Sequence, residues 1–170
     1  MDTCDECGFK YDVTALRPLD RLLRDAVEPY RAVLDGDAAD LRTRPAPGTW
    51  SALEYAGHVR DVLLAQRERV LLALVEDVPV FTPIHRDERA AIVRDGERPP
   101  SQVLAELVFA AELLADTFAV LDDAQLARTG IYNYPTPQPR SVEWIGVHTL
   151  HECHHHLLDI ERGNARVNSR

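Results

Sequence analysis

The segment from residue 148 to residue 160 reads H-T-L-H-E-C-H-H-H-L-L-D-I and contains five of the chain's seven histidines. An α-helix repeats every 3.6 residues, so side chains three or four positions apart share one face. One such face would carry His148, His151, His155 and Asp159. Trp144 continues this face toward the N-terminus, which indicates that the face points into the protein. Since buried imidazoles need polar partners, a metal ion on His151 and His155 is favoured here over a solvated histidine run.

The same segment contains H-E-C-H-H at residues 151–155, which matches the H-E-x-x-H pattern of zinc proteases. Those enzymes take a third metal ligand from beyond the helix, and the extended pattern with a downstream glycine and histidine is missing here. Glu161 is the single downstream glutamate, and we expect it to lie on the same helix. The pattern therefore disfavours a protease and predicts that a third ligand comes from another helix.

The composition bounds the class of protein. The chain has 170 residues, enough for one domain with a substantial core. Its 19 Lys and Arg residues against 28 Asp and Glu residues give a net charge of −9, which argues against binding nucleic acid. No apolar run approaches the roughly 18 residues of a membrane span, so no membrane association is expected. The acidic start of the chain does not resemble a secretory signal, and we expect a cytoplasmic protein.

Four long amphipathic patterns predict the fold. Apolar residues recur three and four positions apart over residues 16–34, 51–75, 102–121 and 141–162. Ser51 and Glu54 form a capping-box pattern, while Ser101 and Ser141 are expected to cap the later helices. Pro29 should kink or interrupt the first helix, and Gly163 should end the last. With no convincing strand, these patterns predict an all-α four-helix bundle whose long connections permit a crossover topology.

The connections and ends complete the expected organisation. Residues 77–100 lack a clear period, so this long connection should be functional or hold a short helix, with the charges of 85–89 solvated. Asp122 and Asp123 should cap a turn that ends at Leu126, and residues 130–139 read as a Pro-rich linker. We expect an N-terminal tail over residues 1–15, a bundle over 16–163 and a frayed end over 164–170.

The tail carries a Cys-x-x-Cys pair, Cys4 and Cys7, which looks like half of a zinc knuckle. A second such pair is missing, and Cys153 is the one other cysteine. Three interpretations stay open. In the first, the pair binds a metal together with a histidine from elsewhere, such as His154 or His85. In the second it is a redox pair, and in the third it is an inert turn.

His58 is the candidate for the third ligand of the histidine site. It lies beside the inner face of the second predicted helix, where a single histidine is more often a boundary residue than a ligand. Helix bundles, however, build metal sites from inward side chains of facing helices. Because His151 and His155 lack a third ligand, the three histidines together form a plausible site.

Two segments carry a resemblance to a known family: P-A-P-G-T-W-S-A-L-E-Y-A-G-H-V-R-D-V at residues 45–62 and the histidine-rich segment at 148–160. Together they resemble the DinB-like, or S-transferase-like, superfamily. This resemblance implies an up-down-down-up bundle and a divalent metal, zinc or nickel, on three residues that are commonly histidines. At matching positions these are His58, His151 and His155.

The resemblance also leaves an alternative ligand set. A related branch, similar to mycothiol-dependent maleylpyruvate isomerase, uses His, Glu and His, and in that register Glu152 and His156 would be the ligands. We prefer His151 and His155, with His148 and Asp159 as outer supports. Many members carry H-R-G-Q after the last ligand region, where this chain has His156 and two leucines. The surroundings of the metal therefore depart from the family pattern.

Family members include isomerases and transferases that depend on a low-molecular-weight thiol such as mycothiol. The leading hypothesis is a metal-dependent enzyme that activates such a thiol, or water, for transfer to, or isomerisation of, a small electrophilic substrate. The long connections at 77–100 and 130–140 would cover an open site. The alternative is a non-catalytic, metal-stabilised bundle that acts as a binding or sensing module. A homodimer is left open.

Overall fold

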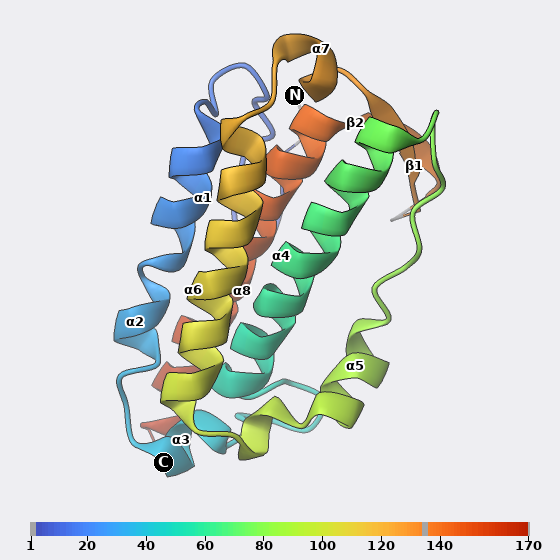
Figure 1. Ribbon diagram of the computed structural model, residues 1–170. Coiled ribbons are helices and arrows are strands. Elements are labelled where there is room, and N and C mark those ends of the chain that lie inside the picture. The colour runs from blue at the N-terminus through green and yellow to red at the C-terminus, as the bar shows by residue number, and fades with distance from the viewer. Residues whose placement is uncertain (1–2, 134–135, 170) are drawn as a thin grey trace.

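The computed structural model describes residues 3–133 and 136–169 and shows four long helices packed side by side (Figure 1). These helices are α1 (Leu19–Val27), α4 (Ala52–Val75), α6 (Pro100–Ala119) and α8 (Val142–Val167). In Figure 1, α1 and α8 run from top to bottom, whereas α4 and α6 run from bottom to top. The order is therefore up-down-down-up, which confirms the predicted four-helix bundle.

Each long helix packs against two of the others: α4 contacts α6 and α8, and α1 also contacts α6 and α8. The core between them is built from fully buried side chains such as Leu23, Leu53, Leu63, Leu107, Leu114 and Ile145. Each such leucine or isoleucine contributes about 1.5–3 kcal/mol of burial free energy before conformational entropy is counted. The framework of the bundle is thus apolar, and we expect this core to fold without a metal.

The helix ends follow local chemistry at most predicted positions. Ser51 and Glu54 form the predicted capping box at the start of α4, and the Ser141 hydroxyl accepts a hydrogen bond from the Trp144 amide at the start of α8. Ser101 does not cap α6. The helix begins two residues earlier than predicted, at Pro100 with Pro99 as its N-cap, because proline's fixed φ suits the first helical position.

The last helix continues past Gly163 to Val167, four residues beyond the predicted stop. Contacts outside the helix explain the extension. The Asn164 side chain donates a hydrogen bond to the Val33 carbonyl at 3.0 Å, and Gly163 lies beside Pro45. Tertiary contacts therefore hold turns that the glycine alone would weaken.

The first predicted helix is divided. After α1, Pro29 begins the short helix α2 (Tyr30–Val33), and Asp37 caps a further short helix, α3 (Ala38–Arg42). Because proline lacks an amide hydrogen, it cannot continue the hydrogen-bond ladder of α1. The predicted interruption at this proline is confirmed.

The connection between α4 and α6 returns along the whole bundle (Figure 1) and holds α5 (Arg86–Val93) and a 3₁₀ turn, η1 (Asp95–Glu97). The charges at 85–89 are exposed, as predicted. Asp95, in contrast, is 3% exposed and makes paired hydrogen bonds of 2.9 and 3.0 Å with the buried guanidinium of Arg60. It fits against Gly57, where an added Cβ would lie 2.1 Å from a carboxylate oxygen. This buried ion pair fixes the connection to α4.

The predicted Pro-rich linker is wrong in part, because it contains a two-stranded antiparallel sheet. Strands β1 (Thr129–Tyr132) and β2 (Gln138–Ser141) pair with Thr129 opposite Ser141 and Tyr132 opposite Gln138. Pro139 is tolerated because β2 is an edge strand. Residues 134–135 of the linker lie outside the described part of the chain. The short helix α7 (Asp123–Leu126) precedes the sheet, and Asp122 caps it as predicted.

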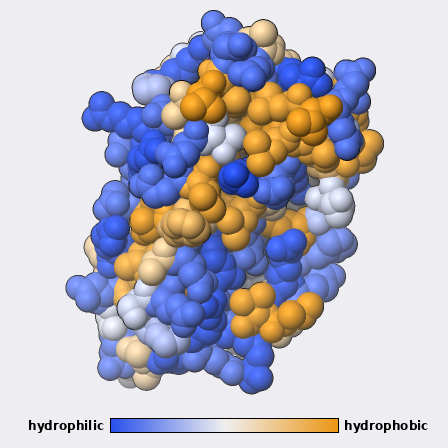
Figure 2. All heavy atoms as spheres, in the orientation of Figure 1, coloured by the Kyte–Doolittle hydropathy of each residue, from blue (hydrophilic) through white to orange (hydrophobic). Residues whose placement is uncertain are grey.

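The surface seen in Figure 2 is mostly hydrophilic, with hydrophobic residues at the upper right, in a band across the middle and in a smaller patch at the lower right. Exposed valines follow the end of α4 and the start of the next connection: Val75, Val78 and Val80. None of the helices in the described part of the chain combines the length and apolar character that a membrane span requires.

Candidate metal centres

A row of imidazoles lies on α8, and much of it is buried. His148, His151 and His156 are each at most 9% exposed, and the Glu152 carboxylate lies among them. Its Oε1 is 3.3 Å from Nδ1 of His151, and its Oε2 is 3.6 Å from Nε2 of His156. Among the described residues this row takes part in four overlapping groups of metal-ligating side chains. Two of them, His148 with His151 and Glu152, and His155 with His156 and Asp159, lie within α8 alone. The other two add ligands from a second part of the chain and are described next.

The first, the interhelical cluster, consists of His58, Glu152 and His156, whose ligand atoms all lie within 4.8 Å of one another. His58 comes from α4, and the other two come from successive turns of α8. The His58 and His156 rings meet edge to face, with centroids 4.9 Å apart. Two facing helices therefore bring two imidazoles and one carboxylate together in the bundle interior.

Burial and charge set the protonation of the interhelical cluster. Burial, together with the nearby His156, lowers the pKa of His58 to about 4, so its ring is neutral at neutral pH. Burial alone would also lower the pKa of His156, but a hydrogen bond to Asp159 and the nearby Glu152 carboxylate raise it to about 9. Burial would raise the pKa of Glu152, yet His151 and His156 hold it well below its ordinary value. The carboxylate is thus ionised, and a metal would displace the proton of His156.

Two further residues support this cluster. Asp159 Oδ2 lies 3.0 Å from His156 Nδ1, which directs the other ring nitrogen of His156 toward Glu152. His148 has its Nδ1 3.0 Å from the Tyr11 hydroxyl and its Nε2 3.7 Å from Glu152. A carboxylate behind a ligating imidazole fixes the orientation of the ring. Asp159 and His148 therefore lie where outer supports of a metal site would be needed.

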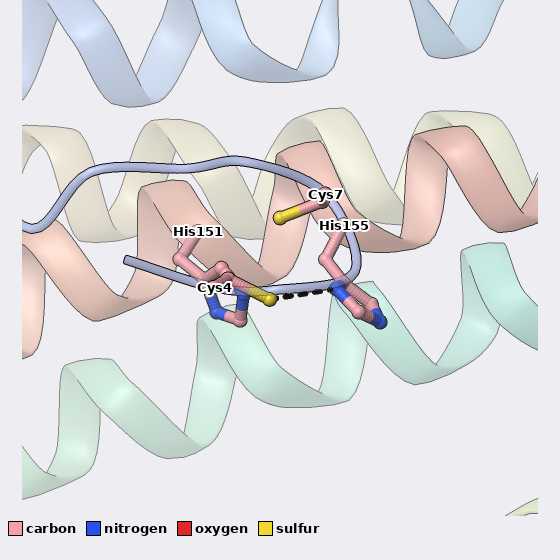
Figure 3. Close-up of side chains that lie close together, drawn as sticks. All are labelled: Cys4, Cys7, His151 and His155. Atoms are coloured by element: carbon pink, nitrogen blue, oxygen red, sulfur yellow. Dashed lines mark hydrogen bonds between the residues drawn. The ribbon is translucent and has the colours of Figure 1, made fainter. Parts of the chain in front are cut away.

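The second, the tail cluster, consists of Cys4, Cys7, His151 and His155, again with ligand atoms within 4.8 Å of one another. Figure 3 shows the N-terminal segment lying over α8, with both sulfurs near the two histidines. The Cys4 sulfur is 3.7 Å from Nδ1 of His155. The cysteine pair and the i, i+4 histidine pair of the sequence therefore meet in space.

The preferred set of His58, His151 and His155 does not gather as one group among the described residues. The reason is rotational. Successive residues of an α-helix are about 100° apart, so the pair at 151 and 155 points toward a different neighbour than the pair at 152 and 156. The pair at 152 and 156 faces α4 and His58, as in the alternative ligand set, while the pair at 151 and 155 faces the tail.

Comparison with protein families matches residues 20–160 to the DinB superfamily. The chain belongs to the DinB superfamily. The matched range includes every residue of the interhelical cluster and begins after Cys4 and Cys7, so the tail cluster draws half its members from outside the family region.

Among solved structures, this DinB-superfamily chain is similar to YfiT from Bacillus subtilis, described as a probable metal-dependent hydrolase with an unusual four-helix bundle topology. The two share 20% sequence identity with a TM-score of 0.77, over 88% of this chain and 86% of YfiT. At this identity the likeness establishes a shared fold. A comparison with curated protein sequences finds no match.

Aromatic side chains surround the interhelical cluster of this DinB-superfamily protein. The Trp50 ring contacts His58 at 5.3 Å between centroids, and the Tyr55 ring contacts His156 at 5.4 Å. The exposed guanidinium of Arg86, from α5, lies 5.7 Å above the Trp50 ring. Trp50 and Tyr55 lie in the segment at 45–62 that carries the family resemblance, but no sequence pattern connected Arg86 with the cluster, because α5 reaches it only through the long connection.

Proposed function

We propose that the protein is a metal-dependent enzyme whose divalent metal ion is held by His58, Glu152 and His156. The observation that carries this proposal is the convergence of three ligating side chains from two facing helices into the bundle interior. The imidazoles are 7% and 6% exposed. A polar cluster of this kind is costly inside a bundle unless its members are paired or bind an ion.

The chemistry of the donors fits the proposed metal. Two imidazole nitrogens and one carboxylate oxygen suit zinc or nickel, and three protein ligands leave at least one position for a water or a thiol. His58 is neutral and Glu152 is ionised, as ligation requires. Bound there, the metal would act as a Lewis acid that favours the thiolate or hydroxide form of a coordinated molecule.

The residues around the cluster have separate tasks in this proposal. Asp159 holds the His156 ring in place, while Trp50 and Tyr55 provide apolar walls that limit access of bulk water. Arg86 places a positive charge beside Trp50 on this side of the cluster, which favours substrates with an anionic group. A low-molecular-weight thiol such as mycothiol, attacking a small electrophile, is the preferred reaction class, and hydrolysis by metal-bound water is the second.

The proposal is tested by removing and restoring the metal. Chelator-treated protein is assayed for consumption of a small electrophile with and without added thiol, and for ester hydrolysis, before and after zinc or nickel is returned. We expect activity to disappear with the metal and return with it. His58→Ala and His156→Ala should each lose at least about 100-fold, since outer supports alone commonly contribute 10–100-fold.

His154→Ala is the matched control, because His154 is an exposed histidine on the same helix. It should keep wild-type metal content and activity. Full activity in metal-free protein, or in His58→Ala, would overturn the proposal. A bound metal with no exchangeable water or thiol position would instead support the non-catalytic binding or sensing module.

A further inference from the structure

We propose that Cys4, Cys7, His151 and His155 bind one zinc ion, which fastens the N-terminal segment to α8 as a structural clasp. This site is separate from the interhelical cluster and does not depend on the activity proposed for it. Two of its ligands come from a short turn and two from one face of a helix, so the ion would join parts of the chain that are about 150 residues apart in sequence.

The tail is folded into a turn that presents both sulfurs. The Cys4 amide donates to the Phe9 carbonyl at 2.9 Å, and the Gly8 amide donates to the Cys4 carbonyl at 2.8 Å. Gly8 has a φ of +73°, a conformation that side-chain-bearing residues rarely adopt. The Cys7 and Glu6 amides face the Cys4 sulfur, and the Phe9 amide faces the Cys7 sulfur. These amides would satisfy the thiolates of a metal site.

On the helix, His151 lacks the partners that its burial demands. It is 9% exposed, and neither ring nitrogen makes a hydrogen bond among the described residues. Glu152 Oε1 is 3.3 Å from Nδ1, but without hydrogen-bond geometry. A buried imidazole without a hydrogen bond is costly. A zinc ion would satisfy one nitrogen and leave the other for the carboxylate.

The distances agree with tetrahedral zinc. With Zn–S near 2.3 Å and Zn–N near 2.0–2.1 Å, a sulfur and a nitrogen on one zinc ion lie about 3.6 Å apart. The Cys4 sulfur and His155 Nδ1 are 3.7 Å apart. All four ligand atoms lie within 4.8 Å of one another, so the remaining contacts need only small movements of side chains.

His155 is also supported from behind. Its Nε2 lies 3.4 Å from a Glu6 carboxylate oxygen and 3.7 Å from an Asp159 oxygen, which leaves Nδ1 directed at the cysteine pair. A carboxylate on the far nitrogen of an imidazole is the usual outer partner of a zinc-bound histidine. Tail and helix therefore contribute both the ligands and their supports.

Four protein ligands of the Cys₂His₂ type close the coordination sphere, so this zinc would be structural. The clasp would hold the tail's aromatic residues against the imidazole row. The Phe9 ring contacts His151 at 5.5 Å, and the Tyr11 hydroxyl lies 3.0 Å from His148 Nδ1. Zinc at the tail would thus shield the row of α8 from solvent.

Cobalt(II) substitution tests the clasp in the full chain. Thiolate ligands give cobalt an intense sulfur-to-metal charge-transfer absorption, which the interhelical cluster, lacking sulfur, cannot produce. We expect reduced wild-type protein to bind two equivalents and to show this absorption. The Cys4→Ser/Cys7→Ser double variant should keep one equivalent without it, and His58→Ala should keep the absorption while losing the other equivalent.

His155→Ala and His151→Ala should each shift the cobalt titration of the thiolate signal at least about 10-fold to higher concentration. His154→Ala, on the same helix, should leave it unchanged. Absence of the thiolate absorption in reduced wild-type protein would overturn the proposal and indicate a redox pair or an inert turn. Unchanged affinity in both histidine variants would overturn it equally, since the cysteines would then bind metal without the helix.

Discussion

The interhelical cluster and the tail cluster use neighbouring residues of α8, but each combines them with a different second element of the chain. The interhelical cluster is anchored on α4 and α8, helices of 24 and 26 residues that are packed into the apolar core. The tail cluster pairs the same α8 with a short turn held by a few backbone hydrogen bonds. We expect a ligand set built on a packed core to persist without its ion, and a set built on a short turn to depend more on the ion to stay assembled.

Glu152 links the two clusters. One carboxylate oxygen is 3.3 Å from His151 and the other is 3.6 Å from His156, so a single side chain contacts a histidine of each cluster. A one-residue step along α8 therefore separates two proposed roles, one catalytic and one structural. Variants with a substitution in one cluster therefore test whether metal binding at the other cluster is independent of it.

The largest expected effect is on the metal and activity of the interhelical cluster. His156→Ala should remove one equivalent of metal and reduce activity at least about 100-fold. The apolar core remains, so helical content by circular dichroism should stay close to wild type. Complete unfolding of this variant at room temperature would show that the interhelical metal is structural, and would remove the contrast between the clusters.

The next largest expected effect is on stability, through the buried ion pair of Arg60, which lies on α4 two residues after His58, with Asp95. Among the described residues, Arg60→Met leaves the buried Asp95 carboxylate with Arg98 at 2.9 Å as its remaining ion-pair partner, and breaking a buried pair in this way costs about 3–5 kcal/mol. Urea unfolding should show this loss. The exposed pair of Arg21 and Asp25 is the matched control, and Arg21→Met should change stability by less than about 1 kcal/mol.

In the same Arg60→Met protein, the cobalt–thiolate absorption of the tail cluster should persist under conditions where the bundle remains folded. Suppose instead that α4 unfolds in a partial transition at a lower urea concentration than the rest of the bundle. If the absorption disappears in that same transition, the tail cluster also depends on α4. The two clusters would then form one cooperative unit.

The three cysteines should differ in reactivity when metal is removed. Burial would raise the pKa of Cys4, but the facing backbone amides and the nearby His151 ring lower it to about 6, so it is a thiolate at neutral pH. Burial raises the pKa of Cys153 to about 12. Iodoacetamide should label Cys4 quickly, with a rate that falls below pH 6, and Cys153 only after unfolding.

Zinc should protect Cys4 and Cys7 from this labelling and leave Cys153 unchanged, as read by mass spectrometry. Equal labelling of the tail cysteines with and without zinc would contradict the clasp. Fast labelling of Cys153 in folded protein would contradict its burial in the core.

The smallest effect is a dependence of stability on acid at the start of α4. Burial would raise the pKa of Glu54, but hydrogen bonds from Arg44 and Ser51 hold it below its ordinary value near 4.5. A lowered pKa contributes stability above pH 4.5 that disappears as the pH falls. Glu54→Gln, which keeps the capping pattern, should be less stable by about 1 kcal/mol at pH 7 and nearly equal to wild type in acid. The exposed Glu68, on the same helix, provides the control as Glu68→Gln and should show no such convergence.

Local sequence chemistry was sufficient for the bundle. Apolar periodicity located the four long helices, the Ser51 and Ser141 caps placed the starts of α4 and α8, and the Asp122 cap placed the start of the short α7, because a cap acts on amides within three residues. The histidine spacing indicated a buried imidazole face, and His148 and His151 on this face are buried, whereas His155 is partly exposed. The prediction at Ser101 was wrong because the neighbouring proline begins the helix instead. Beyond Gly163 and in the β-hairpin, contacts with segments distant in sequence decided the outcome.

Tertiary structure alone decided which imidazoles meet which partners. Spacing shows that residues 151 and 155 share a stripe and that 152 and 156 share another, but the stripes are only about 100° apart and both are rich in ligands. The packing of α4 against α8 turns the second stripe toward His58, and the folded-back tail covers the first. The buried pair of Arg60 and Asp95 was equally hidden in the sequence, since 35 residues separate its members. Rotation of a helix about its own axis is set by the neighbours that bury it, and a local pattern contains no information about those neighbours.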